Sequence, residues 1–250
     1  MVAYILSVLA LLTLLASTRV SKGQYNYAKL SQGNSQARAR RDDAEIRRHY
    51  RTTDYDEPEP TDPVRAAQRK AKQKRYNGAS WVGRNISPEV AEAWSIPERH
   101  FDFPALPVDR SDAVVLVGMI DAQAHLSEDK HNIYSEFTVH IERVFKAESP
   151  KLVQDSEIIV DRVGGFVLYP DGRKILYRVA GCGMPHIGGR YVLFLNSIHE
   201  KNDYSILTGY ELSPSGVASL DESPQFFAFD GYDEASFLKA LNDASKTKSP

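Results

Sequence analysis

A glycine-rich loop that runs directly into an apolar strand does most to limit the folds open to this chain. Residues 181–189 contain four glycines, and residues 190–195 read Arg-Tyr-Val-Leu-Phe-Leu. Glycine loops that bind phosphate lead into a helix, whereas Tyr, Val and Phe are typical of strands. The loop therefore predicts a sharp corner in a β-sheet rather than a phosphate site.

Strand patterns recur along the chain on both sides of this loop. Between residues 134 and 145, Phe137, Val139 and Ile141 alternate with polar residues, which predicts one buried and one wet face. Gly118 and the apolar pair at 144–145 interrupt their strands and predict β-bulges. Strands are expected at 113–121, 134–145, 158–160, 166–169, 174–179, 190–196, 204–211 and 217–220. Their spacing predicts a mainly β fold, an OB-like antiparallel β-barrel or small sandwich over residues 111–230.

The C-terminal residues 231–250 are expected to form a helix and tail. Residues 233–244 place Phe237, Leu238 and Leu241 on one helical side, which predicts docking on the barrel. The aromatic group at 226, 227, 229 and 232 is interpreted as packing between helix and barrel. The alternative is an exposed surface for contact with another protein.

The N-terminal residues 1–23 read as a signal peptide or membrane anchor. Residues 2–16 are almost wholly apolar, and Ser21-Lys22-Gly23 offers small residues at a cleavage site. This predicts an exported protein that is extracytoplasmic or membrane-anchored. Arg19, Lys22 and Lys29 follow the apolar run, so an inverted anchor with a cytoplasmic C-terminal side is the alternative. With one cysteine in the chain, an intrachain disulfide is excluded.

Residues 24–78 are expected to be a disordered basic linker. Residues 19–75 carry 15 Lys and Arg against 8 Asp and Glu, whereas the chain from 76 onward carries 16 against 25. Few large apolar residues occur in this segment, so little surface is available to offset chain entropy. Residues 65–75 are compatible with a short helix, but Val64 at its start is the only sizeable apolar residue there, so it lacks the apolar face of a membrane-surface helix. Its composition suits a solvated linker. The alternative is that its positive charge, together with the apolar residues 2–16, attaches the protein to a membrane. Residues 79–110 are expected to form a short helix near 87–94 and an extended arm containing Phe101 and Phe103.

Two groups of residues are candidates for chemistry, one for a metal site and one for a catalytic thiol. His125, Glu128, Asp129 and His131 share the expected loop 122–132 and would be the ligands of a metal ion if that loop folded on itself. Solvated side chains at a barrel mouth are the favoured interpretation, so no metal is predicted. Cys182 and His186 would form a thiol–imidazole pair if the loop brought them together, yet no third orienting residue is evident. No phosphate, dinucleotide or hydrolase motif occurs, and no cofactor is predicted.

Several segments together resemble a known family. These are residues 111–118, 134–139 leading into 142–146, and 185–195. They resemble an uncharacterised family of exported bacterial proteins whose OB-like barrel is similar to the netrin and metalloproteinase-inhibitor modules. In those inhibitors an N-terminal cysteine chelates the protease zinc. The cysteine of this chain, Cys182, lies in a mid-chain loop, so the resemblance does not extend to inhibition.

Three functions follow from these observations. The favoured one is a noncatalytic, exported or membrane-tethered module that binds a protein or a cell-envelope component. A nucleic-acid-binding OB protein is the second, supported by the basic linker and opposed by the acidic remainder. The third is a hydrolase or thiol enzyme that uses Cys182 and His186.

Overall fold

The computed structural model describes residues 52–77, 101–148, 152–177, 179, 181–198 and 203–246. The chain divides into two compact units, 1–44 and 45–250, and every described residue belongs to the second. The predictions for residues 1–23, for the first part of the linker and for the helix near 87–94 lie outside the described residues. Neither helix in the described ranges combines the length and the apolar character of a membrane span.

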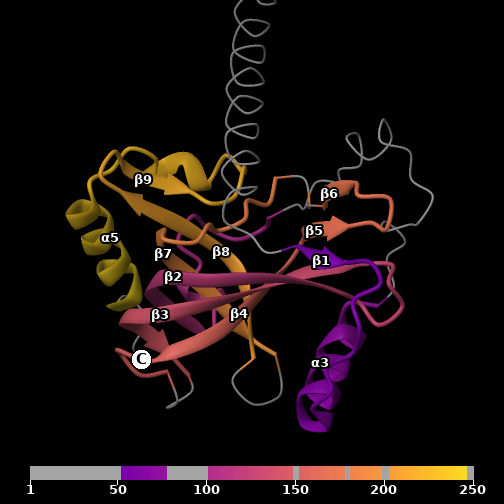
Figure 1. The fold of residues 1–250 in the computed structure, drawn as a ribbon. Helices are drawn as coiled ribbons and strands as arrows, with labels where there is room; N and C mark the ends of the chain where they lie inside the picture. The colour runs from indigo at the N-terminus through magenta and orange to yellow at the C-terminus, as the bar shows by residue number, and fades with distance from the viewer. Residues whose placement is uncertain are drawn as a thin grey trace, which may run out of the picture. The chain divides into compact units, whose positions relative to one another are not determined.

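The fold is mainly β, built around a six-stranded sheet (Figure 1). Its strands follow the order β4–β3–β2–β7–β8–β9, and consecutive neighbours in this order pair antiparallel. A further parallel pairing, of Val160 with Tyr204 and Asp161 with Ser205, joins β4 to β8 and completes a circuit of five strands. The bounds are β2 (Ala113–Leu126), β3 (Ile133–Ala147), β4 (Glu157–Val163), β7 (Arg190–Ser197), β8 (Tyr204–Ser213) and β9 (Gly216–Ser219).

The alternation predicted for β3 is confirmed, since Phe137, Val139 and Ile141 are fully buried in one core cluster. The break near 144–145 is also confirmed. Val114 pairs with Lys146 and Val115 with Val144, so Phe145 is the extra residue of a bulge. Gly118 itself pairs in register with His140, and the nearby bulged residue is Ile120. The prediction of a bulge at Gly118 was therefore close but misplaced.

A small second sheet has the order β1–β5–β6, with β1 (Thr53–Asp54), β5 (Gly165–Leu168) and β6 (Lys174–Tyr177). The strands β5 and β6 form the hairpin predicted around residues 170–172, and Gly172 has a φ of 84° in its turn. The strand β1 pairs parallel to β5, which ties a residue pair from the expected linker to the β domain.

The glycine loop turns the chain into β7, as predicted. Gly188 has a φ of 81°, a left-handed value that favours glycine. A Cβ on Gly183 would lie 1.9 Å from the Leu220 carbonyl oxygen, so that position has no space for a side chain. The four glycines thus allow close packing at a corner of the sheet.

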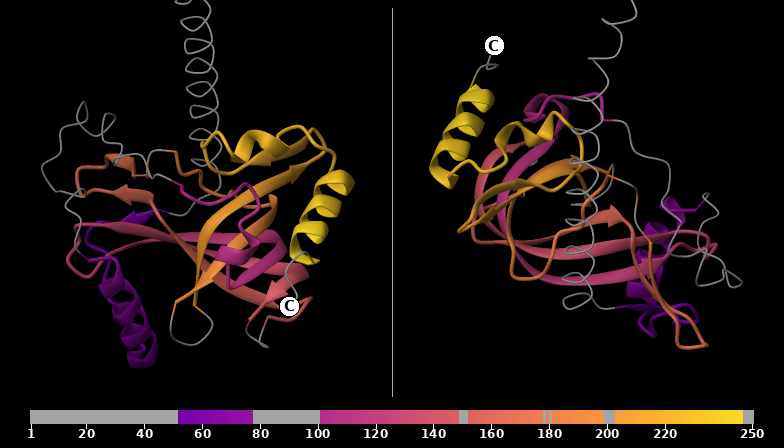
Figure 2. Two further views of the ribbon diagram at one scale, coloured as in Figure 1. Left: turned by 180° about the vertical axis from the view of Figure 1, so that it is seen from behind. Right: turned by 90° about the horizontal axis from the view of Figure 1, so that it is seen from above.

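The C-terminal helix α5 (Glu234–Lys246) docks on the sheet at the end opposite the helix α3 (Pro63–Arg75), as the two views of Figure 2 show. Phe237 and Leu241 are fully buried in the cluster that contains Phe226 and Tyr210. The arm at 101–107 joins this cluster through Phe101, and a short 3-10 helix η1 (Val108–Arg110) leads from it into β2.

The aromatic group near residue 226 only partly packs as predicted. It lies in a 3-10 helix η2 (Phe226–Phe229) and the turn that follows. Phe226 is buried and Phe229 packs against the cluster, but Phe227 and Tyr232 are 45% and 44% exposed. The packing prediction is therefore wrong for Phe227 and Tyr232.

The largest departure from the sequence prediction is the helix α3 (Pro63–Arg75). Asp62 caps it by accepting a hydrogen bond of 2.8 Å from the Arg65 N–H, and proline occupies its first turn. The prediction of a disordered linker is wrong for residues 52–77. The argument from composition considers only the apolar surface that a segment can bury. It does not include the charged groups on the folded sheet that hold α3.

Candidate binding site beneath a basic helix

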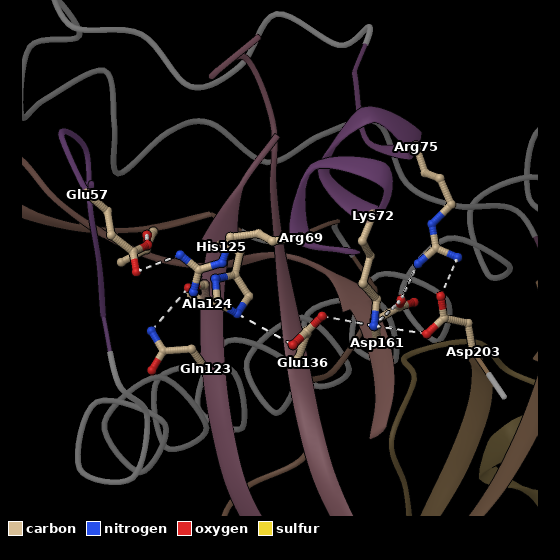
Figure 3. Close-up of polar contacts among 11 residues, drawn as sticks. Glu57, Arg69, Lys72, Arg75, Gln123, Ala124, His125, Glu136, Asp161 and Asp203 are labelled. Carbon is tan, nitrogen blue, oxygen red and sulfur yellow. Dashed lines mark hydrogen bonds and ion pairs between the residues drawn. The ribbon is translucent and has the colours of Figure 1, made fainter. Parts of the chain in front are cut away.

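One side of α3 carries the residues that face the sheet. Arg69, Lys72 and Tyr76 follow a spacing of three and four residues, which places them on one side of a helix. Beneath them lie outward-facing residues of β2, β3 and β4 and one residue that immediately precedes β8 (Figure 3). We call this set the α3 site: His125, Tyr134, Glu136, Asp161 and Asp203.

The sheet register brings the acidic members of the α3 site together. Glu136 on β3 pairs directly with Asp161 on β4. The parallel pairing of Asp161 with Ser205 then brings the start of β8, and with it Asp203, to the same end of the sheet. Three carboxylates from distant parts of the sequence therefore converge at one place.

Lys72 enters this acidic cluster. Its Nζ lies 2.9 Å from Glu136 Oε1, 3.4 Å from Asp161 Oδ2 and 3.5 Å from Asp203 Oδ1, and its side chain is 9% exposed. Burial by itself would lower the pKa of Lys72, but the neighbouring carboxylates outweigh burial and raise that pKa. Lys72 is therefore a buried ammonium held by three carboxylates.

Asp161 is the most enclosed of the acids, with no exposed surface. It accepts hydrogen bonds of 2.6 Å from the Tyr76 hydroxyl and 3.2 Å from Arg75 Nη2. Burial raises the pKa of Asp161 despite the opposing effects of Lys72, Tyr76 and Arg75. Asp161 thus meets three groups of the α3 segment, two of which are cationic.

The pKa of Glu136 is shifted in the opposite direction from that of Asp161. Burial would raise its pKa, but the hydrogen bond with His125 and the charge of Lys72 lower it to about 2. His125 Nε2 lies 3.5 Å from Glu136 Oε2. Glu136 thus remains a carboxylate under ordinary conditions and is the strongest anchor for Lys72.

An aromatic contact lies next to the charged cluster. The rings of Tyr76 and Tyr134 stack with centroids 4.2 Å apart and planes at 10°. Burial raises the pKa of each of these tyrosines, so both hydroxyls stay protonated and can donate hydrogen bonds. Tyr76 uses its hydroxyl on Asp161, and its ring covers Tyr134.

Two buried atoms of the α3 site are left without a hydrogen-bond partner among the residues that the structure describes. They are His125 Nδ1 and the Tyr134 hydroxyl. His125 is 5% exposed and Tyr134 is not exposed at all. Because unpaired buried polar atoms are costly, α3 does not satisfy all the hydrogen-bonding capacity of the site.

The middle of α3 contacts the β2–β3 loop and the segment that follows β1. Arg69 Nη1 donates a hydrogen bond of 3.1 Å to Glu57, and Lys70 lies 3.6 Å from Glu128. Lys130 Nζ donates to the Tyr55 carbonyl oxygen at 2.8 Å. A pocket of about 120 Å³ lies among these elements. Charged and polar contacts thus dominate the whole interface.

The structure does not gather the four residues considered for a metal. The strand β2 continues to Leu126, so His125 lies on a strand and contacts Glu136. Asp129 accepts a hydrogen bond from the Ser127 hydroxyl, and His131 Nδ1 lies 3.8 Å from Asp129. Among the described residues, no group of three or more His, Cys, Asp or Glu side chains is placed to hold a metal ion.

Cys182 and His186 each have other neighbours. Cys182 is buried and, with Asp221, raises the pKa of the buried Arg162 against the effect of burial. His186 Nε2 lies 2.9 Å from Glu211 Oε1, and its Nδ1 lies 3.2 Å from the Ile187 carbonyl oxygen. Both ring nitrogens of His186 are thus engaged by groups other than the thiol.

Sequence reasoning missed the residues of the α3 site apart from His125. The sizeable apolar residue at the start of this helix, Val64, is 64% exposed and takes no part in the docking. The available signal was the spacing of Arg69, Lys72 and Tyr76 on one helical side. The acidic partners could not be found in the same way, because they become neighbours only through strand pairing.

No family model matches the chain, and no curated protein matches it significantly.

Proposed function

We propose that this protein is a noncatalytic binding module, exported or membrane-tethered, in which an OB-like β-barrel binds a positively charged protein segment. The observation that carries this proposal is the docking of α3. Near the C-terminal end of this basic helix, Lys72 and Arg75 form ion pairs with Glu136 on β3 and Asp161 on β4. Because the segment bound there is a basic helix, we infer that the ligand is also a basic protein segment.

The strand circuit supports the OB-like assignment. Numbered along the chain, its five strands β2, β3, β4, β7 and β8 pair in the order 1-2-3-5-4 and back to 1. This is the order expected of an OB barrel, whose second and third strands and adjoining loops form a common ligand face. Those strands correspond to β3 and β4, where α3 lies.

The charge of this face favours a cationic protein over nucleic acid. Glu136 and Asp161 lie on the two strands, and Asp203 lies beside them. Phosphates would be repelled by these carboxylates, while Lys and Arg side chains are attracted. A folded protein helix also offers the aromatic contact that Tyr134 makes, which favours a protein over other components of the cell envelope.

The resemblance to exported proteins with netrin-like modules agrees with a binding role outside the cytoplasm. The apolar segment at 2–16 and the basic residues that follow would supply export or tethering. N-terminal sequencing of the protein fractionated from its host tests this part. We expect a start at Gln24 in a soluble envelope fraction or an intact Met1 in membranes facing outward; a cytoplasmic location of residues 45–250 would contradict it.

Binding can be tested with the full chain in detergent micelles, carrying Lys72→Met to weaken α3 docking. Labelled lysine- and arginine-rich helical peptides, acidic peptides and single-stranded oligonucleotides are titrated by fluorescence anisotropy. We expect saturable binding of the basic peptides only, and its loss when Glu136→Gln and Asp161→Asn are added. Oligonucleotide binding without peptide binding would favour the nucleic-acid alternative instead.

A further inference from the structure

The α3 site has the features of a specific receptor for one lysine. An ammonium group has three N–H donors, and Lys72 meets three carboxylates, from Glu136, Asp161 and Asp203, within 3.5 Å. Arg75 approaches the same cluster from its side, with Nη1 at 3.4 Å from Asp203 Oδ2, and its side chain stays 26% exposed. Lys72 therefore occupies the enclosed position between the carboxylates, whereas Arg75 lies at the edge of the cluster.

An aromatic position lies one helical turn after the lysine. Tyr76 follows Lys72 by four residues, so both side chains leave the same side of the helix. The Tyr76 ring stacks on the fully buried Tyr134, and its hydroxyl reaches Asp161. Lysine and an aromatic residue at this spacing thus form one recognition unit.

The helix α3 is held weakly by comparison with a core helix. Within Pro63–Arg75, which the structure describes in full, Lys72 is the buried residue, so docking buries little apolar side chain. The buried His125 Nδ1 and Tyr134 hydroxyl find no hydrogen-bond partner in the described ranges. An incoming helix that pairs these two atoms would have an advantage over α3.

We propose that α3 is a resident occupant that exchanges with a basic helix of another protein. The partner helix presents a lysine in place of Lys72 and a tyrosine four residues later in place of Tyr76. This inference rests on the proposed function, because it names the partner and the regulation of the same face. Because the partner can bind only while α3 is undocked, its apparent affinity is the intrinsic affinity multiplied by the fraction of time that the site is free.

The probe for this proposal is a labelled, end-capped peptide with the sequence of residues 62–77. It is titrated onto the full chain in detergent micelles, as the natural sequence and as the Lys72→Met variant. We expect the variant to bind at least about tenfold more tightly, because its own helix competes less. Lys74→Met, a change at an exposed position of α3, is the matched control and should bind like the natural sequence.

Changes in the peptide test the recognition unit. Peptides carrying Lys72→Gln or Tyr76→Ala should bind the Lys72→Met protein at least about tenfold more weakly, whereas Lys74→Gln should change little, since Lys74 is exposed on α3. Equal losses for Lys72→Gln and Lys74→Gln, with no loss for Tyr76→Ala, would overturn the specific unit and leave general charge attraction.

The outcomes separate this inference from the function on which it rests. If the peptide binds the natural sequence and the Lys72→Met variant equally well, exchange with α3 is refuted while binding on this face stands. If neither protein binds this peptide but other basic helices bind, the recognition unit is refuted alone. If no basic peptide binds either protein, both proposals fail.

Discussion

Replacing Lys72 with methionine measures what one ammonium group contributes to the docking of α3. Methionine keeps most of the side-chain volume but leaves Glu136 and Asp161 facing each other without their shared cation. Removing one partner of a buried ion pair costs about 3–5 kcal/mol. Asp203 is 37% exposed and Arg75 still contacts Asp161, so we expect the lower value, about 3 kcal/mol.

Hydrogen exchange followed by mass spectrometry reports this loss locally. A cost of about 3 kcal/mol raises the opening equilibrium of α3 by roughly 100-fold, and the amides of residues 66–76 should lose protection by that factor. The amides of β3 and β7 should change little, because their core clusters do not include α3. A 100-fold loss of protection requires that the free energy of α3 docking in the natural sequence is at least about 3 kcal/mol.

The controls make the result specific to the buried charge. Lys74→Met, at an exposed position of the same helix, should change protection by less than about 0.5 kcal/mol. Adding Glu136→Gln to Lys72→Met removes one uncompensated carboxylate and should restore part of the protection. Unchanged protection of α3 in Lys72→Met would refute the reasoning, and so would an equal loss throughout the sheet.

Three further predictions concern acid stability, the glycine corner and the C-terminal helix. The folded pKa of Glu136, about 2, lies below its ordinary value of 4.5, so its stabilisation of about 3 kcal/mol is present above pH 4.5 and is lost as the pH falls toward 2. Thermal unfolding between pH 6 and about 2.5 should therefore show a shallower loss in Glu136→Gln than in the natural sequence. Gly183→Ala places a Cβ 1.9 Å from the Leu220 carbonyl oxygen and should destabilise the fold by about 3 kcal/mol in chemical denaturation; an unchanged midpoint would show that the corner relaxes. Phe237→Ala removes a fully buried ring from the cluster under α5 and should cost about 3–5 kcal/mol in the same assay, against less than about 0.5 kcal/mol for the exposed Lys239→Ala.

The strands were predictable because their signal is local. The alternation of Phe137, Val139 and Ile141 identifies a buried face without knowledge of any partner strand. The closure of the circuit was not predictable in the same way, since the pairing of Val160 with Tyr204 depends on the whole arrangement. The extension of β2 beyond residue 121 was missed because alanines at 122 and 124 are small and give a weak strand signal.

The sequence allowed a short helix at 65–75, but its docking on the β domain was not predicted, for a different physical reason. Disorder is inferred when a segment lacks enough apolar surface to offset its chain entropy. That inference omits the free energy available from charges fixed on an already folded surface. Glu136 and Asp161 are such charges, because strand pairing holds them side by side.

The uneven charge of the chain also acts within the molecule, between the basic segment and the β domain. An excess of basic residues before position 76 and of acidic residues after it first suggested a tether attracted to anionic surfaces. Part of that attraction is satisfied inside the molecule, where Lys72 and Arg75 meet the acids of the β domain. Any anionic surface that recruits this segment must therefore compete with the α3 site, and any cationic partner of the site must compete with the segment. Each kind of binding then favours the other, because an anionic surface that draws α3 away leaves the acidic face open.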